Sequence, residues 1–203
     1  MSSGIVHVID DDEALRDSVA FLLGTAGFAV RLYDSAQTFL RQLRDIEPGC
    51  VLTDIRMPGM DGLELLRLLR ETGQAIAVIV MTGHGDVPLA VRAMKLGAVD
   101  FIEKPFEDEI MIDTVRAALA ADVVPGTAQV DEELASRVAT LSQREKQVLT
   151  GLVGGRTNKE IARQFDLSPR TVEVYRAKLM AKMQASNISE LVRFAMRAGV
   201  STS

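Results

Sequence analysis

Five polar side chains follow short apolar stretches of the chain, at points where strands are expected to end. They are Asp10, Asp11, Asp54, Thr82 and Lys104. Because the carboxyl ends of parallel strands meet at one edge of an α/β sheet, these side chains are expected to lie together. Three neighbouring carboxylates need a cation, and hard oxygen ligands without clustered Cys or His favour Mg²⁺. The set therefore predicts a site that handles a phosphoryl group.

Each member of this set has a definite part in the expected chemistry. Asp54, the central carboxylate, would accept the phosphoryl group as an acyl phosphate. Lys104 and the metal ion would stabilise the phosphoryl oxygens, and Thr82 would donate a hydrogen bond to one of them. Taken singly, an Asp after a strand is most often a turn residue, Thr82 a turn hydroxyl and Lys104 a solvated charge. Their common position at strand ends favours the site.

The elements that would position these residues alternate along the first 122 residues. The expected strands are 5–9, 28–32, 51–53, 77–81 and 99–102, and a helical pattern follows each of them. Continuous apolar strands imply a parallel sheet that is buried on both faces. The predicted fold is therefore a (βα)5, doubly wound α/β domain of the flavodoxin-like class over residues 1–122.

Length and composition are those of an ordinary globular protein. The chain has 203 residues, enough for two domains, and 47% of them are hydrophobic. It has no apolar stretch long enough to span a bilayer and no export signal at its amino terminus. Its single cysteine, Cys50, can form no internal disulfide. We therefore expect a cytoplasmic protein.

The net charge of −5 is unevenly distributed along the chain. Residues 1–124 carry 20 acidic and 11 basic residues, a net charge of −9. Residues 140–203 carry 5 acidic and 11 basic residues, a net charge of +6. This asymmetry indicates two domains with different partners, and the basic one is suited to a polyanion. Chance variation on solvated surfaces would explain the charges alone about as well.

After a linker at 123–139, residues 140–203 show the pattern of an all-α, four-helix domain of the helix-turn-helix class. Ser142 with Glu145 forms a capping box for its first helix, and Ser168 followed by Pro169 begins the third. Basic residues on the exposed face of the third helix indicate DNA contact, although a plain helical bundle fits the pattern alone equally well. The expected phosphate contacts are Arg170, Thr171, Arg176, Lys178 and Lys182, and Glu173 and Val174 would face base edges.

The first half closely resembles bacterial response-regulator receiver domains. The matching segments are Val8-Ile-Asp-Asp-Asp-Glu13, Asp54 with Met57-Pro-Gly-Met-Asp-Gly62, Thr82-Gly83, and Phe101 with Lys104-Pro105. The resemblance implies that a sensor histidine kinase phosphorylates Asp54. It also implies a Mg²⁺ site formed by Asp10, Asp11, Asp54 and the backbone carbonyl of Arg56. Thr82 and Phe101 would be a switch pair, Lys104–Pro105 would be a cis bond, and Asp12 would cap a helix.

The second half resembles the LuxR/NarL-type DNA-binding domain over about residues 137–200. The matching segments are Leu141-Ser-Gln-Arg-Glu145, Asn158-Lys-Glu-Ile-Ala162 and Ser168–Arg176, in which Tyr175 replaces the usual His. The whole chain, including 83–88 and 101–108, is similar to the members of this family that control nitrogen fixation. That likeness implies an oxygen-sensing haem kinase as the phosphoryl donor and nitrogen-fixation promoters as the targets.

Together these features predict a two-component response regulator that activates transcription and is a phospho-acceptor with slow self-dephosphorylation, not an enzyme. Phosphorylation of Asp54 would relieve a restraint on the DNA-binding domain and produce a homodimer on promoter DNA, where it would meet RNA polymerase. Two alternatives stay open. One is a Mg²⁺-dependent aspartyl-phosphate phosphatase, although such enzymes carry a second Asp where this chain has Arg56. The other is a phosphate-relay receiver whose output is not DNA binding.

Overall fold

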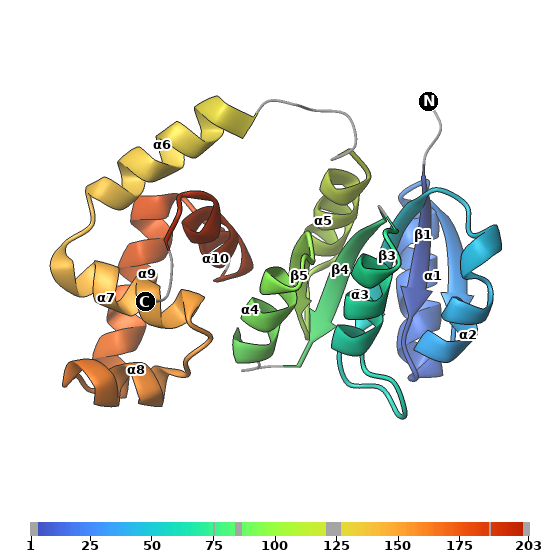
Figure 1. Cartoon of the computed structure of the whole chain (residues 1–203), viewed down its shortest axis with the longest axis horizontal. Coiled ribbons are helices and arrows are strands. Elements are labelled where there is room, and N and C mark those ends of the chain that lie inside the picture. Colours follow the sequence, from blue (N-terminus) through green and yellow to red (C-terminus); the bar gives the residue numbers. More distant parts are fainter. Residues whose placement is uncertain (1–3, 75, 84–86, 121–126, 187, 201–203) are drawn as a thin grey trace. The chain divides into compact units, whose positions relative to one another are not determined.

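The structure is a computed structural model that describes residues 4–74, 76–83, 87–120, 127–186 and 188–200 (Figure 1). The chain divides into two compact units, the first formed by residues 1–86 with 93–123 and the second by residues 87–92 with 124–203. Each unit buries its own apolar side chains. No helix within these described ranges is long and apolar enough to cross a membrane.

Five parallel strands form the sheet of the first unit, in the order β2-β1-β3-β4-β5. They are β1 (Ile5–Ile9), β2 (Ala29–Tyr33), β3 (Gly49–Asp54), β4 (Ala77–Thr82) and β5 (Asp100–Glu103). The order reverses between β1 and β3, as in flavodoxin-like sheets, whose ligands bind at that point outside the carboxyl ends of the strands. The α/β fold predicted from the alternating pattern is confirmed.

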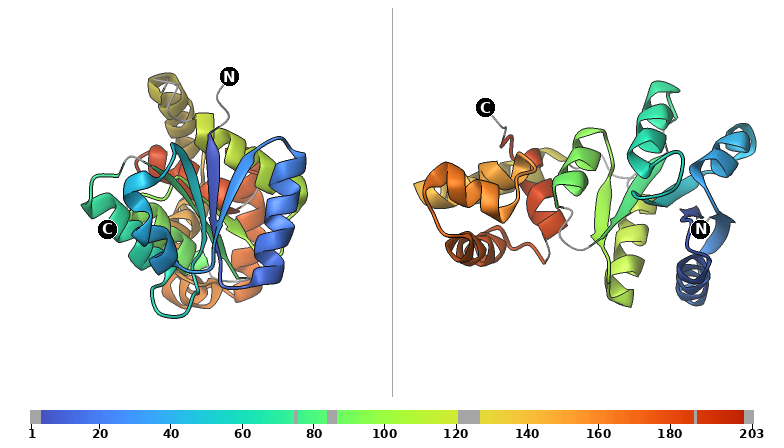
Figure 2. Two further views of the ribbon diagram at one scale, coloured as in Figure 1. Left: turned by 90° about the vertical axis from the view of Figure 1, so that its right-hand side faces the viewer. Right: turned by 90° about the horizontal axis from the view of Figure 1, so that it is seen from below.

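Helices cover both faces of this sheet (Figure 2). They are α1 (Glu13–Thr25), α2 (Ala36–Arg41), α3 (Gly62–Glu71) and α5 (Asp108–Ala120), with a 3₁₀ turn at Leu43–Asp45. Helix α4 (Val87–Lys95) lies between β4 and β5 in the sequence, and its residues 87–92 group with the second unit. Apolar residues of α1 and α5 pack with every second residue of the central strands, among them Val8, Leu52 and Met81. Cys50 lies in the same cluster, where burial raises the pKa of its thiol to about 12, so it acts as a small apolar side chain.

The opposite face of β1 carries a buried histidine. His7 is 1% exposed and packs edge-on against Phe39 of α2. Its Nε2 donates to the carbonyl of Glu47 at 3.0 Å, which leaves Nδ1 to accept from the Tyr33 hydroxyl at 3.3 Å. This arrangement uses both nitrogens of a neutral imidazole, and burial lowers the pKa of His7 below its ordinary value.

The described part of the second unit consists of α6 (Thr127–Ala139), α7 (Gln143–Val153), α8 (Asn158–Phe165), α9 (Pro169–Met183) and α10 (Ile188–Arg197). Most of the segment that the sequence predicts as a linker is thus the helix α6. It packs against α9 and α10 (Figure 1), and its Leu134 is buried. The sequence predicted a linker with some helix and left its geometry open, because the residues of this segment alone do not show which other helices it packs against.

Local sequence explains where these helices begin and end. Ser142 and Thr157 form capping boxes at the start of α7 and α8, and Ser168 with Pro169 starts α9. Asp166, in the left-handed conformation at φ 52°, ends α8 and leaves a turn of three residues before α9. Helices α8 and α9 therefore form the helix-turn-helix that the sequence predicts.

Candidate functional site

The strand ends bring four of the five predicted phosphoryl-site residues to one edge of the sheet. Asp10 and Lys104 come one residue after β1 and β5, and Asp54 and Thr82 are the last residues of β3 and β4. The parallel registers keep these ends level. The sheet, rather than any loop, thus sets the positions of the site residues.

Lys104 joins the two buried carboxylates. Its Nζ lies 2.9 Å from Oδ2 of Asp10 and 2.5 Å from Oδ1 of Asp54. Asp10 is 2% exposed and Asp54 is 8% exposed, so both negative charges are withdrawn from water. Buried charges persist only when they are paired and hydrogen-bonded, and one ammonium meets that need for both carboxylates. The predicted association of Asp10, Asp54 and Lys104 is present.

Backbone groups complete the shells of both carboxylates. Oδ1 of Asp10 accepts from the N–H of Asp12 at 2.9 Å, and Oδ2 of Asp54 accepts from the N–H of Arg56 at 2.5 Å. Gly62 allows this turn, because a Cβ there would collide with the carbonyl oxygen of Asp54. Its N–H instead donates to the carbonyl of Ile55 at 2.9 Å. The loop after β3 therefore folds back closely on the acidic residue.

The electrostatics of the pair favour a protonated lysine. Burial alone would lower the pKa of Lys104, but the hydrogen bonds to Asp54 and Asp10 raise it above its ordinary value. Burial raises the pKa of Asp54, and the hydrogen bond from Lys104 opposes that rise. The site thus holds a fixed positive charge beside a carboxylate that is destabilised by its surroundings, which suits the binding of further positive charge or an incoming electrophile.

Thr82 and Phe101, the predicted switch pair, are both 3% exposed. Phe101 pairs with Val80, two residues before Thr82, so the two side chains leave the same face of the sheet. The Thr82 hydroxyl donates a long hydrogen bond of 3.4 Å to the carbonyl of Gly83. The Lys104–Pro105 bond is cis, as the family resemblance implied. Residues 84–86 of the quoted motif lie outside the described residues.

The predicted cluster of three carboxylates is not assembled. Among the residues that the structure describes, no group of three or more His, Cys, Asp or Glu side chains could hold a metal ion. Asp11 is exposed, whereas Asp10 is buried, because successive side chains at the end of a strand leave it in opposite directions. Asp12 caps α1 through the N–H of Leu15, as expected. Two buried carboxylates, not three, face Lys104.

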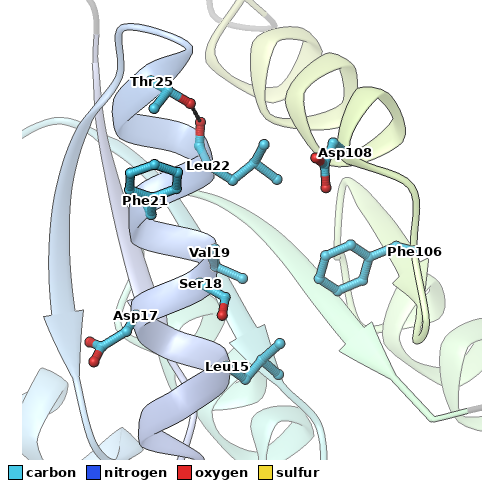
Figure 3. A pocket seen from close by; sticks show the side chains of 9 residues that line it. All are labelled: Leu15, Asp17, Ser18, Val19, Phe21, Leu22, Thr25, Phe106 and Asp108. Carbon is cyan, nitrogen blue, oxygen red and sulfur yellow. Dashed lines mark hydrogen bonds between the residues drawn. The ribbon is translucent and has the colours of Figure 1, made fainter.

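A groove lies along α1. A cavity of about 540 Å³ lies between α1 and the segment that leads into α5, and Val19 and Leu22 face Phe106 across it (Figure 3). Phe21, which also lines it, is 76% exposed. None of Asp10, Asp54, Thr82 and Lys104 is among the residues that line the groove.

The predicted DNA-contacting residues all lie on α9. Val172, Leu179 and Met183 are fully buried and fix one face of the helix on the rest of the unit. The opposite face carries Arg170, Glu173, Val174 and Lys178, which are exposed. Val174 is 49% exposed, which is unusual for a large apolar side chain and fits a contact with a base methyl group.

Three of the predicted contacts form side-chain hydrogen bonds inside the unit, and the ammonium of a fourth, Lys178, lies 5.6 Å from the centre of the Tyr175 ring. Thr171 hydrogen-bonds to the capping Ser168 at 2.7 Å. Arg176 donates to Oδ1 of Asn158 in α8 at 3.0 Å. Lys182 donates to Glu145 at 2.7 Å and thereby connects α9 to α7. A phosphate contact by Arg176 or Lys182 would have to share these groups with their present partners.

Sequence reasoning missed two supporting residues. Arg16 donates from Nη1 to the backbone carbonyl of Asp10 at 2.6 Å and so ties α1 to the site. Glu145, expected only as a capping residue, is buried and also binds Lys182. The contact of Arg16 could have been predicted, because a basic residue near the start of a helix can reach back to the strand end that precedes the helix. Glu145 and Lys182 are too far apart in sequence to be paired by spacing.

Comparison with known proteins assigns a family to both halves. Residues 6–116 match the family described as "Response regulator receiver domain", and residues 139–195 match "Bacterial regulatory proteins, luxR family". The transcriptional regulatory protein FixJ of Bradyrhizobium diazoefficiens is 54% identical over 98% of this chain and 98% of its own. FixJ of Azorhizobium caulinodans is 56% identical over 96% of this chain and 93% of its own.

A solved structure agrees with these matches. The crystal structure of full-length FixJ from B. japonicum is 55% identical, covers 98% of both chains and has a TM-score of 0.59. The response regulator protein TodT of Pseudomonas putida is 40% identical over 96% of this chain. The chain belongs to the two-component response regulators that join a receiver domain to a luxR-family DNA-binding domain, and it is similar to FixJ over nearly its whole length.

Proposed function

We propose that this response regulator is switched by phosphorylation of Asp54 and that the phosphorylated chain activates nitrogen-fixation promoters when oxygen is low. The observation that carries the proposal is the convergence of Asp54 and Asp10 on the Lys104 ammonium at the carboxyl edge of the sheet. The promoter class is supported by the identity with FixJ proteins. By the same likeness the donor is a sensor histidine kinase of the FixL type.

Phosphoryl transfer requires one nucleophile and a positive environment. A carboxylate oxygen of Asp54 attacks the phosphorus of a kinase phosphohistidine, the O–P bond forms, the P–N bond breaks and the imidazole leaves with the electron pair. The Lys104 ammonium, which already contacts Asp54, is placed to hydrogen-bond a phosphoryl oxygen as the charge moves outward. The Arg56 N–H holds the second carboxylate oxygen in place.

The donors at this edge fit Mg²⁺. Asp10 and Asp54 supply hard carboxylate oxygens on two neighbouring strands, and the peptide of Arg56 adjoins Asp54. We propose that these three groups, with Asp11, hold the ion, whose charge when bound neutralises phosphoryl oxygens. Within the described residues, the Lys104 ammonium forms ion pairs with both Asp10 and Asp54.

Thr82 and Phe101 convert the modification into a change of surface. The weak bond from Thr82 to Gly83 can be exchanged for one to a phosphoryl oxygen, and Phe101 on the same face then repacks. This alters the surface of α4, β5 and α5, where we propose that two phosphorylated chains dimerise. The dimer presents two α9 helices to successive major grooves, about 34 Å apart, and contacts RNA polymerase in the cytoplasm.

Labelling with acetyl phosphate tests the acceptor. Intact mass spectrometry should show one added phosphoryl group on the wild-type chain in the presence of Mg²⁺ and none on Asp54→Asn. Asp12→Asn is the matched control, because it makes the same chemical change at a residue whose side chain caps α1. Asn caps helices as well as Asp does, so this variant should keep the fold and the label. Labelling of Asp54→Asn at the wild-type level would contradict the assignment. Multiple turnover of a generic phosphomonoester would favour the phosphatase alternative, and slow loss of the label alone would not.

A further inference from the structure

The carboxyl end of α9 is bound by a side chain from another helix. Helix ends leave carbonyl groups without helical partners. At this end the N–H of Ala185 binds the carbonyl of Met180 at 2.9 Å, and that of Gln184 binds Ala181. The carbonyl of Met183, the last residue of α9, accepts instead from Nη1 of Arg137 at 2.8 Å.

Arg137 belongs to α6 and is held firmly there. Its Nη2 binds Oε1 of Glu133, one turn earlier, at 2.6 Å, and its side chain is 23% exposed. Leu134 beside it is 3% exposed. A guanidinium at a helix carboxyl end also meets the negative end of the helix dipole. Helix α6 is therefore joined to the carboxyl end of α9 by a charge-assisted hydrogen bond from Arg137.

A second arginine makes the same kind of bond elsewhere in the unit. Arg144 of α7 donates to the carbonyl of Phe165, the last residue of α8, at 2.9 Å. The two hydrogen bonds are chemically alike, but their donors lie on different helices, Arg137 on α6 and Arg144 on α7. Helix α7 is within the DNA-binding domain, whereas α6 begins directly after residues 121–126, which connect the two units.

We propose that Arg137 is a positioning residue that transmits the state of the receiver to α9. Helix α6 is the first described helix after residues 121–126 in the sequence, so in this proposal a change in the receiver reaches the DNA-binding domain through α6, and the Arg137–Met183 hydrogen bond passes it to α9. This inference rests on the proposed function, in which phosphorylation controls DNA binding. Arg137 then affects how strongly phosphorylation changes DNA affinity, whereas Arg144 affects only the stability of the DNA-binding domain.

The test measures DNA affinity of the full chain with and without acetyl phosphate, at one fixed salt concentration. The probe is a duplex carrying the site that the phosphorylated wild-type chain protects in a footprint. The quantity of interest is the ratio of the two dissociation constants. Arg137→Gln should lower that ratio about three- to tenfold relative to wild type, the range of a typical coupling energy between sites. Arg144→Gln, the matched control, should keep the wild-type ratio while lowering thermal stability.

Each outcome decides the matter. A wild-type ratio in Arg137→Gln overturns the inference, and so does an equal fall in both variants, because that would reflect general loosening of the unit. A wild-type chain whose affinity ignores phosphorylation contradicts the proposed function instead, which is a separate result. If Arg137→Gln does not fold, Arg137→Lys keeps the charge but not the planar fork, and it must then show the lowered ratio. An unchanged ratio in Arg137→Lys would in that case overturn the inference.

Discussion

Replacing Glu145 by Gln tests how strongly a buried ion pair holds α7 to α9. Glu145 is 3% exposed, and its Oε2 accepts from the N–H of Ser142 at 2.8 Å and from Nζ of Lys182 at 2.7 Å. Gln keeps the length and the oxygen that Ser142 requires but removes the charge that Lys182 requires. The substitution therefore isolates the ionic part of the interaction.

The pKa of Glu145 gives the size of the effect. The hydrogen bond from Lys182, followed by that from the Ser142 N–H, lowers this pKa from 4.5 to about 2. The whole shift corresponds to on the order of 3 kcal/mol at neutral pH. Gln keeps the bond to Ser142 and Lys182 is partly exposed, so the loss expected from removing the charge is roughly 2 kcal/mol. Because the folded pKa lies below the unfolded one, this stabilisation is present above pH 4.5 and is lost as the pH falls towards 2.

Urea unfolding of residues 124–203, followed by far-UV circular dichroism, measures the change in free energy. Glu160→Gln is the matched control, because Glu160 occupies the same position in the capping box of α8 but is exposed. Glu145→Gln should lose about 2 kcal/mol at neutral pH and roughly half of that or less at about pH 3, whereas the control should lose much less at neutral pH. Equal losses in the two variants, or an unaltered acid dependence in Glu145→Gln, would refute the reasoning.

Three further outcomes are expected. Gly62→Ala should destabilise the receiver by about 1–3 kcal/mol and slow labelling of Asp54, because the added Cβ would collide with the backbone of Asp54. Gly24→Ala is the control and should be neutral or stabilising, because its Cβ would have no neighbour within 4 Å. Urea midpoints and labelling rates measure both variants. Phe21 is a large apolar side chain that is 76% exposed, which suits contact with a partner protein, so Phe21→Ser should slow transfer from the kinase but leave acetyl phosphate labelling unchanged. An equal effect on both donors would exclude a docking role for this side chain. Because burial lowers the pKa of His7, receiver stability should fall as the pH drops below 6.5, and His7→Gln should flatten that dependence in urea titrations; a parallel pH profile would count against it.

The phosphoryl site was predictable because topology alone places it. Once five apolar stretches are taken as parallel strands, the residues after them must share an edge, and Asp10, Asp54 and Lys104 do. The pattern could not say which of two successive acidic residues turns inward. The structure buries Asp10 and exposes Asp11, so among the described residues the three carboxylates are not gathered in one group, and the part of Asp11 in a metal site stays a prediction.

Contacts within the second unit were out of reach of the sequence. Glu145 and Lys182 meet only through the packing of α7 on α9, and Arg137 meets Met183 only because α6 packs there. No periodicity or capping rule relates residues so distant along the chain. Helix starts, in contrast, were readable, since Ser142 and Ser168 cap the helices that follow them through local hydrogen bonds.

Phosphorylation-dependent footprinting of promoter DNA, at one stated salt concentration, tests the central claim most directly. The wild-type chain treated with Mg²⁺ and acetyl phosphate should protect two adjacent half-sites about one helical turn apart, at concentrations where the untreated chain and treated Asp54→Asn leave the DNA unprotected. Equal protection by treated Asp54→Asn and treated wild type would contradict the account.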